Sequence, residues 1–271
     1  MGTSASSKGS PSGTPLVPPW VPDIQKTIKK PPEPASINPE ITTQSSKAPA
    51  RRFQSTRRQL GNFATTGNKV NLKKGIAQYV TSGHGNKRNT LSRFGGTIHT
   101  GAVLYDTLLL LPQAVSGPKK ELREKLEQAN GNHHEIAITI IDELRPIDGS
   151  QDAEAMRTSM DTAFVELFKQ NENFDILNMQ ANDVNFLLEC FLSEEIYRRI
   201  ELDVGSVIRE KASNALTASE RIREIKEFVY EIVRSEYPKQ SKGRIFSSKE
   251  IGHFIKKLMK SCIDIFAEYT V

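Results

Sequence analysis

The sequence predicts an all-α protein: an irregular helical bundle that follows an extended N-terminal tail rich in proline, serine and glycine. Three observations lead to this prediction. Apolar residues after position 100 repeat with the spacing of helices, and no long stretch alternates with the period of a strand. Ten of the 14 prolines fall within residues 1–50. Only 37% of the 271 residues are hydrophobic, which is low for a chain that folds over its whole length.

The first segment, residues 1–50, is predicted to be extended. Pro, Gly, Ser and Thr fill 26 of its 50 positions, so it has too little apolar surface to offset the entropy of ordering. One patch differs, because it holds the only tryptophan of the chain among apolar neighbours. Such a tryptophan favours an anchoring role. The patch either packs on the body of this chain or docks on a partner in polyproline form. Its residues are Pro15, Leu16, Val17, Pro18 and Trp20.

The second segment, residues 51–100, is basic and punctuated by glycines, and it is predicted to contain two short helices. Their apolar faces are Phe53, Leu60 and Phe63 in the first, and Val70, Leu72, Ile76, Tyr79 and Val80 in the second. Gly95 and Gly96 follow no strand and precede no Walker lysine, so they do not form a phosphate loop. We expect them to mark a close approach of two helices, or a turn before an apolar helix over residues 97–111.

The third segment, residues 101–271, is predicted to be an acidic, all-helical body. Apolar residues at offsets 0, 3, 4, 7, 11, 14, 15 and 18 from Ile251 form one helical stripe. Further helices are predicted over residues 136–144, stopped by Pro146, and over 222–233, ended by Pro238. Two more are predicted over residues 156–167 and 182–199. These stripes are expected to form the core of the bundle.

Charge is distributed unevenly along the chain. Residues 1–100 carry 15 Lys and Arg against 3 Asp and Glu, a net charge of +12, whereas residues 101–271 carry 22 against 29, a net charge of −7. Two interpretations stay open. The basic region, residues 41–105, contacts nucleic acid or an acidic partner, or it docks on the acidic body of the same chain. The candidate nucleic-acid contacts are Arg51, Arg52, Arg57, Arg58, Lys73, Lys74, Lys87, Arg88 and Arg93.

The sequence contains little that predicts chemistry. Residues 133–135, His-His-Glu, resemble a metal cluster, but adjacent residues of a helix point about 100° apart, so we interpret them as a polar helix start. Cys190 and Cys262 lie on apolar faces and are expected to be buried, inert thiols. Glu194 and Glu195 are expected to be a solvated pair. No catalytic or metal-binding residue is predicted, and we expect a protein that is not an enzyme and binds no cofactor of its own.

The longest apolar run, residues 108–111, is far shorter than the ~20 residues that span a membrane. The N-terminus lacks the apolar region of a secretory signal. The sequence therefore predicts a cytoplasmic protein with no membrane partner.

The N-terminus itself is the exception to this lack of chemistry. A small residue, Gly2, follows Met1, so methionine removal is expected to leave an unhindered α-amine. Its pKa of about 7.7–8.0 lies well below the 10.4 of a lysine, so far more of it is neutral and nucleophilic. Gly2 and Ser6 also fit the loose pattern for myristoylation, which would supply only marginal anchoring.

The opening Met1-Gly-Thr-Ser4, and Gly13-Thr-Pro-Leu-Val-Pro18 followed by Trp20, resemble the QatB family of the bacterial Qat anti-phage defence system. The resemblance implies three partners: an ATPase (QatA-like), a QueC-like enzyme (QatC-like) and a TatD-like nuclease (QatD-like). It further implies that the Gly2 amine accepts a 7-deazaguanine group from the QueC-like enzyme. Thr3 and Ser4 would be recognition positions, and the patch around Trp20 would be a second docking point.

Three hypotheses follow. The chain is a non-enzymatic defence component that is conjugated at Gly2, with a helical body that mediates assembly. Alternatively, it is a nucleic-acid-binding adaptor that uses residues 41–105, or a purely structural scaffold for an ATPase and nuclease complex.

Overall fold

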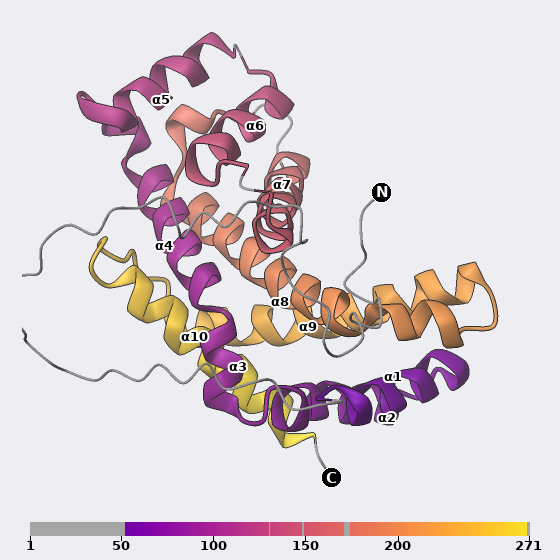
Figure 1. Ribbon diagram of the computed structural model, residues 1–271. Coiled ribbons are helices and arrows are strands. Elements are labelled where there is room, and N and C mark those ends of the chain that lie inside the picture. The colour runs from indigo at the N-terminus through magenta and orange to yellow at the C-terminus, as the bar shows by residue number, and fades with distance from the viewer. Residues whose placement is uncertain (1–51, 130, 148, 171–173, 270–271) are drawn as a thin grey trace, which may run out of the picture. The chain divides into compact units, whose positions relative to one another are not determined.

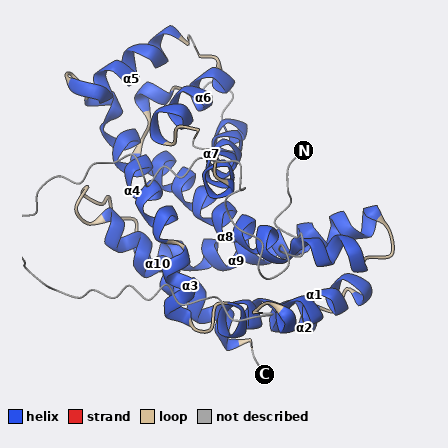
Figure 2. Cartoon of the chain, in the orientation of Figure 1, coloured by secondary structure: helices blue, strands red, loops and turns tan. Residues whose placement is uncertain are grey.

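The computed structural model describes residues 52–129, 131–147, 149–170 and 174–269. Gly2, Thr3, Ser4, the patch around Trp20, and Arg51 lie outside these residues. The described part of the chain is built from helices with no strand (Figure 2), which confirms the prediction of an all-α fold. The predicted segments 51–100 and 101–271 belong to one compact unit.

The described residues form ten α-helices, whose arrangement Figure 1 shows. They are α1 (Gln54–Thr66), α2 (Lys69–Gln78), α3 (Lys87–Arg93), α4 (Gly95–Leu110), α5 (Gly117–Gln128), α6 (His133–Leu144), α7 (Gln151–Gln170), α8 (Ala181–Lys211), α9 (Ala215–Ser241) and α10 (Ile251–Glu268). A π-helical turn, Tyr79–Gly83, extends α2, and short 3-10 turns flank α5 and α8.

Helix α8 is the centre of the fold. Its 31 residues make it about 46 Å long at 1.5 Å per residue, and α1, α4, α7 and α9 all pack against it. It continues 12 residues beyond the predicted end at Arg199, because Ile200, Val204 and Ile208 prolong the apolar stripe and are buried. A capping box formed by Gln180 and Asp183 satisfies its first amides.

The remaining helices cover α8 from several sides. Helix α9 returns antiparallel to it, as the hydrogen bonds from Tyr230 to Glu194 and from Tyr237 to Asn185 show. Helices α1 and α2 pair with each other, and α1 packs on α8. Helix α10 lies against α9, α4, α3 and α2, so the last helix of the body contacts the first basic helices of the chain (Figure 1).

Several helix boundaries follow directly from local sequence. Asn68, Asn86, Asn132 and Asn214 precede α2, α3, α6 and α9, and each side chain accepts a hydrogen bond from an amide of the first turn. The N-cap at Asn132 confirms that residues 133–135 form a polar helix start. Gly96 lies at a close approach of α4 and α7, one of its two expected roles, because a Cβ there would lie 2.9 Å from the Met156 methyl carbon of α7.

One further predicted boundary is wrong, and two helices were not predicted. Helix α9 does not end at Pro238 but continues to Ser241, because a proline in the last turn removes only one amide donor and its ring is exposed. Helices α3 and α5 were not predicted. Helix α5 buries only Leu122 and Leu126, which is too short a pattern to show a helical period.

Candidate functional site: a buried charged network on helix α8

The most unusual chemistry of the described residues lies in the middle of α8. Glu194 and Glu195 are both fully buried, with 0% of their surface exposed, so the prediction of a solvated pair is wrong. The reason is the packing of α8, since α4 and α7 enclose the side chain of Glu195 while α9 encloses that of Glu194. A buried carboxylate is costly unless donors and cations surround it.

Glu195 is held by two other helices, α4 and α7, and by its own helix. Thr97 of α4 donates a hydrogen bond to Oε2 at 2.7 Å, and Ser159 of α7 donates to Oε1 at 2.9 Å. The Arg199 guanidinium, one turn along α8, lies 3.8 Å from Oε2. Burial raises the pKa of Glu195, and these two hydroxyls and the arginine counteract only part of that rise.

A second carboxylate extends this network towards the surface. Asp152 of α7 forms an ion pair with Arg199, which is 2% exposed, and a bidentate pair with Arg93 of α3 at 3.1 and 3.2 Å. Burial alone would raise the pKa of Asp152, but the two arginines outweigh it and hold the pKa below its ordinary value. Two anions and two cations therefore join α3, α4, α7 and α8 at one point.

Glu194 faces the opposite side of α8. Tyr230 of α9 donates a hydrogen bond to it at 2.6 Å, Lys226 lies 2.8 Å away, and Arg198 lies 2.9 Å away. Burial and the charge of Glu194 raise the pKa of Tyr230, which remains a neutral donor. Each of the four carboxylate oxygens lies beside a hydroxyl donor or a cation of the chain, so the network links α8 to α4, α7 and α9.

A third charged cluster joins the start of α1 and the π-helical turn to α8. The Tyr79 hydroxyl donates to Asp203 at 2.8 Å, and His84 Nε2 lies 3.8 Å from the same oxygen. The rings of Phe53, Tyr79 and His84 pack together, with centroids 4.7–5.5 Å apart. Burial lowers the pKa of His84, so its neutral form is favoured. This cluster fixes the start of α1 and the π-helical turn on α8.

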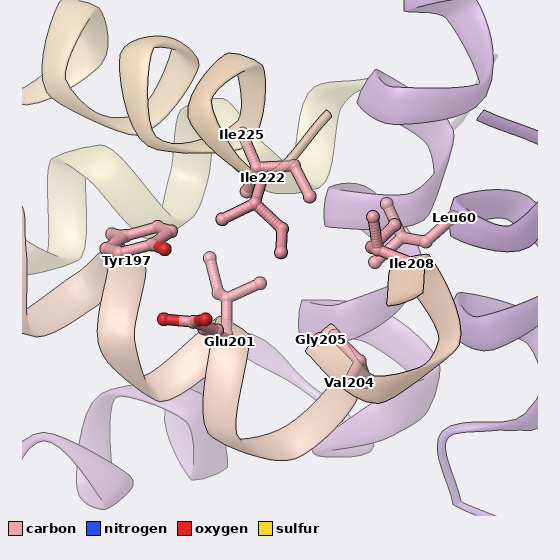
Figure 3. A pocket seen from close by; sticks show the side chains of 9 residues that line it. Leu60, Tyr197, Glu201, Val204, Gly205, Ile208, Ile222 and Ile225 are labelled. Carbon is pink, nitrogen blue, oxygen red and sulfur yellow. The ribbon is translucent and has the colours of Figure 1, made fainter. Parts of the chain in front are cut away.

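The surface carries one small apolar recess and two larger grooves. An apolar recess between α1, α8 and α9 (Figure 3) has a volume of about 10 Å³, room for about one water molecule. A groove of about 460 Å³ lies between α6 and α7, where His133 stacks on Phe168 at 4.2 Å. Another of about 470 Å³ lies between α7 and α9 over Lys226 and Tyr230. Both grooves have the volume of a small-molecule site.

Within the described ranges, no three His, Cys, Asp or Glu side chains are placed to share a metal ion. Cys190 and Cys262 are buried and free, as predicted. Burial raises the pKa of each thiol to about 12. In the part of the chain that the structure describes, every helix is too short or too polar to cross a bilayer.

The predicted nucleic-acid contacts are distributed over several surfaces. Arg93 and Lys87 pair with Asp152 and Asp264, the latter at 2.8 Å, and Arg57 donates to the carbonyl of Asp203. Arg52 and Lys73 lie over aromatic rings. Of the predicted cations that the structure describes, Arg58, Lys74 and Arg88 have no such partner. Part of the basic segment is therefore engaged by the chain's own later helices.

A family model described as "Qat anti-phage system associated protein QatB" matches residues 85–266. The chain belongs to the QatB family. It is thus a component of the Qat anti-phage system, and the other Qat components are its partners. Neither a curated protein nor a solved structure matches the chain significantly.

The family match spans the whole α8 network of this QatB-family protein. This network was not predicted, although the sequence carries a signal for it. Glu194 and Glu195 are each followed four residues later by an arginine, Arg198 and Arg199, which is the spacing of ion pairs on a helix. Only the packing of α4, α7 and α9 distinguishes a buried network from exposed pairs of the same spacing.

Proposed function

We propose that this QatB-family protein is the acceptor of a conjugation reaction, in which the α-amine of Gly2 is joined to a 7-deazaguanine. The single observation that carries the proposal is the N-terminus Met1-Gly-Thr-Ser4 in a chain of this family. After methionine removal, the Gly2 amine is the most nucleophilic amine of the chain at neutral pH, because its pKa of about 7.7–8.0 is more than two units below that of lysine.

The chemistry requires a partner enzyme. A QueC-like enzyme uses ATP to activate the deazaguanine carboxylate, and the neutral Gly2 amine then attacks the activated carbonyl carbon. A C–N bond forms, the nucleotide leaves with the second carboxylate oxygen, and the amine releases a proton. Thr3 and Ser4 are the positions that the enzyme would contact beside the reacting amine.

The length of the tail suits this role. Some 50 residues separate Gly2 from the start of α1 at Gln54, and at about 3.3 Å per residue they can reach at most roughly 170 Å. The helical body can then stay with the ATPase and the nuclease while the N-terminus enters the active site of the QueC-like enzyme. In this proposal the patch around Trp20 docks on that enzyme and brings the amine close.

The test is the intact mass of the N-terminal peptide after co-expression with the other Qat components. We expect a peptide that begins at Gly2 and carries the mass of the deazaguanine acyl group, and an unmodified peptide when the QueC-like enzyme is omitted. Gly2→Leu, which blocks methionine removal, should abolish the addition, whereas Gly9→Leu should keep it. An unmodified wild-type N-terminus in the complete system would refute the proposal.

A further inference from the structure

The exposed face of α10 carries a stripe of basic side chains. His253, Lys256, Lys257 and Lys260 are all exposed and stand at offsets 0, 3, 4 and 7, the spacing that places residues on one face of a helix. Among the described residues none of the four has an ion-pair or hydrogen-bond partner on its side chain. The stripe belongs to the segment that is acidic overall, so the net charge of that segment conceals it.

Helix α3 adds to this face. It packs against α10, and Lys87 pairs with Asp264 at 2.8 Å. Asp264 lies one turn beyond Lys260 on the same face, so the salt bridge neutralises an acid on this face. Arg88, the next residue of α3, is exposed and has no partner among the described residues. Helices α3 and α10 are far apart in the sequence but pack side by side (Figure 1).

We propose that this surface, the α3–α10 basic face of Arg88, Lys256, Lys257 and Lys260, binds the phosphate backbone of a nucleic acid. The stripe from His253 to Lys260 is about 10 Å long at 1.5 Å per residue. Duplex DNA presents one phosphate charge per about 1.7 Å of its axis, so several phosphates face the stripe at once. Lysines bind phosphates as mobile point charges and need no fixed geometry.

The composition of the face favours nucleic acid over an acidic protein. A protein partner draws most of its affinity from a few buried aromatic or apolar anchors. The large exposed apolar residues of the described ranges include Val115, Ile147 and Leu216, but none lies on α3 or α10. A phosphate backbone needs no such anchor, because its affinity comes from the release of counterions.

The proposal differs from the assignment of nucleic-acid contacts to residues 41–105. Arg57, Lys87 and Arg93 of that region are engaged by acceptors of the chain. In the present proposal, three of the four contact residues are instead lysines of the last helix, α10. The inference does not depend on conjugation at Gly2, so either proposal can fail without the other.

The test measures binding of the full chain to a fluorescein-labelled DNA duplex of about 25 base pairs, and to its single strand, over a range of salt concentrations. The variant Lys256→Gln/Lys257→Gln/Lys260→Gln should bind about tenfold or more weakly. The plot of log K against log salt should become less steep, its slope being smaller in magnitude by about 3. The matched control is Lys120→Gln/Lys125→Gln/Lys169→Gln, which makes the same change in net charge on exposed lysines of α5 and α7. It should bind like the wild type.

A variant with the opposite effect completes the test. Asp264→Asn removes the acid from the face and frees Lys87, so it should bind more tightly than the wild type. Equal weakening in both triple variants, an unchanged salt slope in the α10 variant, or no binding by the wild type would overturn the proposal. So would equally effective competition by poly-glutamate of matched charge, since that result would assign the face to an acidic protein.

Discussion

Arg199 offers the sharpest test of how the buried network stabilises the fold. Its side chain is 2% exposed and neutralises Glu195, which is 0% exposed, and Asp152. Removal of one partner from a buried ion pair costs about 3–5 kcal/mol, because the other charge is left without compensation. Asp152 is 41% exposed and keeps Arg93, so it adds little to this cost. We therefore expect Arg199→Met to destabilise the protein by about 3 kcal/mol at pH 8.

The measurement is thermal unfolding followed by circular dichroism at 222 nm. A loss of about 3 kcal/mol lowers the Tm of a unit of this size by roughly 6–12 °C. The matched control is Arg209→Met on the same helix, where an arginine that is 55% exposed pairs with Glu201. That pair should be worth about 1 kcal/mol or less.

The effect should depend on pH with a defined sign. The folded-state pKa of Glu195 is raised, so in the range above the ordinary pKa the folded state binds more protons than the unfolded state. Stability then falls as the pH rises through the folded-state pKa. Loss of Arg199 raises that pKa further, so Arg199→Met should be less destabilising at pH 5 than at pH 8.

A second substitution separates charge from packing. Glu195→Gln in the Arg199→Met background removes the uncompensated charge and keeps an acceptor for a hydroxyl, so it should recover stability at pH 8. If Arg199→Met is as stable as Arg209→Met at pH 8, or if Glu195→Gln recovers nothing, the electrostatic account of this network is wrong.

Three further predictions concern packing, a hydrogen bond and the thiols. Gly75→Ala should cost about 1–3 kcal/mol, because its Cβ would lie 2.6 Å from Leu60 Cδ2. Gly95→Ala, which meets nothing within 4 Å, should be neutral or stabilising in the same thermal assay, and equal losses would contradict the packing argument. Tyr79→Phe should cost about 1 kcal/mol through its lost bond to Asp203, and an unchanged Tm would show that this bond contributes nothing. Cys190 and Cys262, with pKa values raised to about 12 by burial, should react with a thiol reagent only after denaturation. If either cysteine of the native protein reacts as fast as an exposed thiol, then α8 or α10 opens in the folded state.

Much of the fold could be predicted because helical periodicity is a local property. The apolar stripe from Ile251 predicted α10 to within one residue at its C-terminal end, and Pro146 correctly marked the end of α6. Prediction was weaker where the local signal is short or interrupted by charge, as in α5 and in the second half of α8. There, helix formation depends on neighbours that are distant in the sequence.

The candidate sites were likewise only partly predictable from the sequence. The sequence by itself determined the helical class, the chemistry available at Gly2 and the excess of positive charge in the first 100 residues, because each depends on residue identity and short-range spacing. Only the tertiary structure decided that Glu194 and Glu195 are buried, and that Arg93 and Lys87 form ion pairs with carboxylates of α7 and α10. It also decided that α3 packs against the helix that carries the unpaired lysines. Burial and charge pairing are set by which helices meet, and that information is distributed over the whole chain.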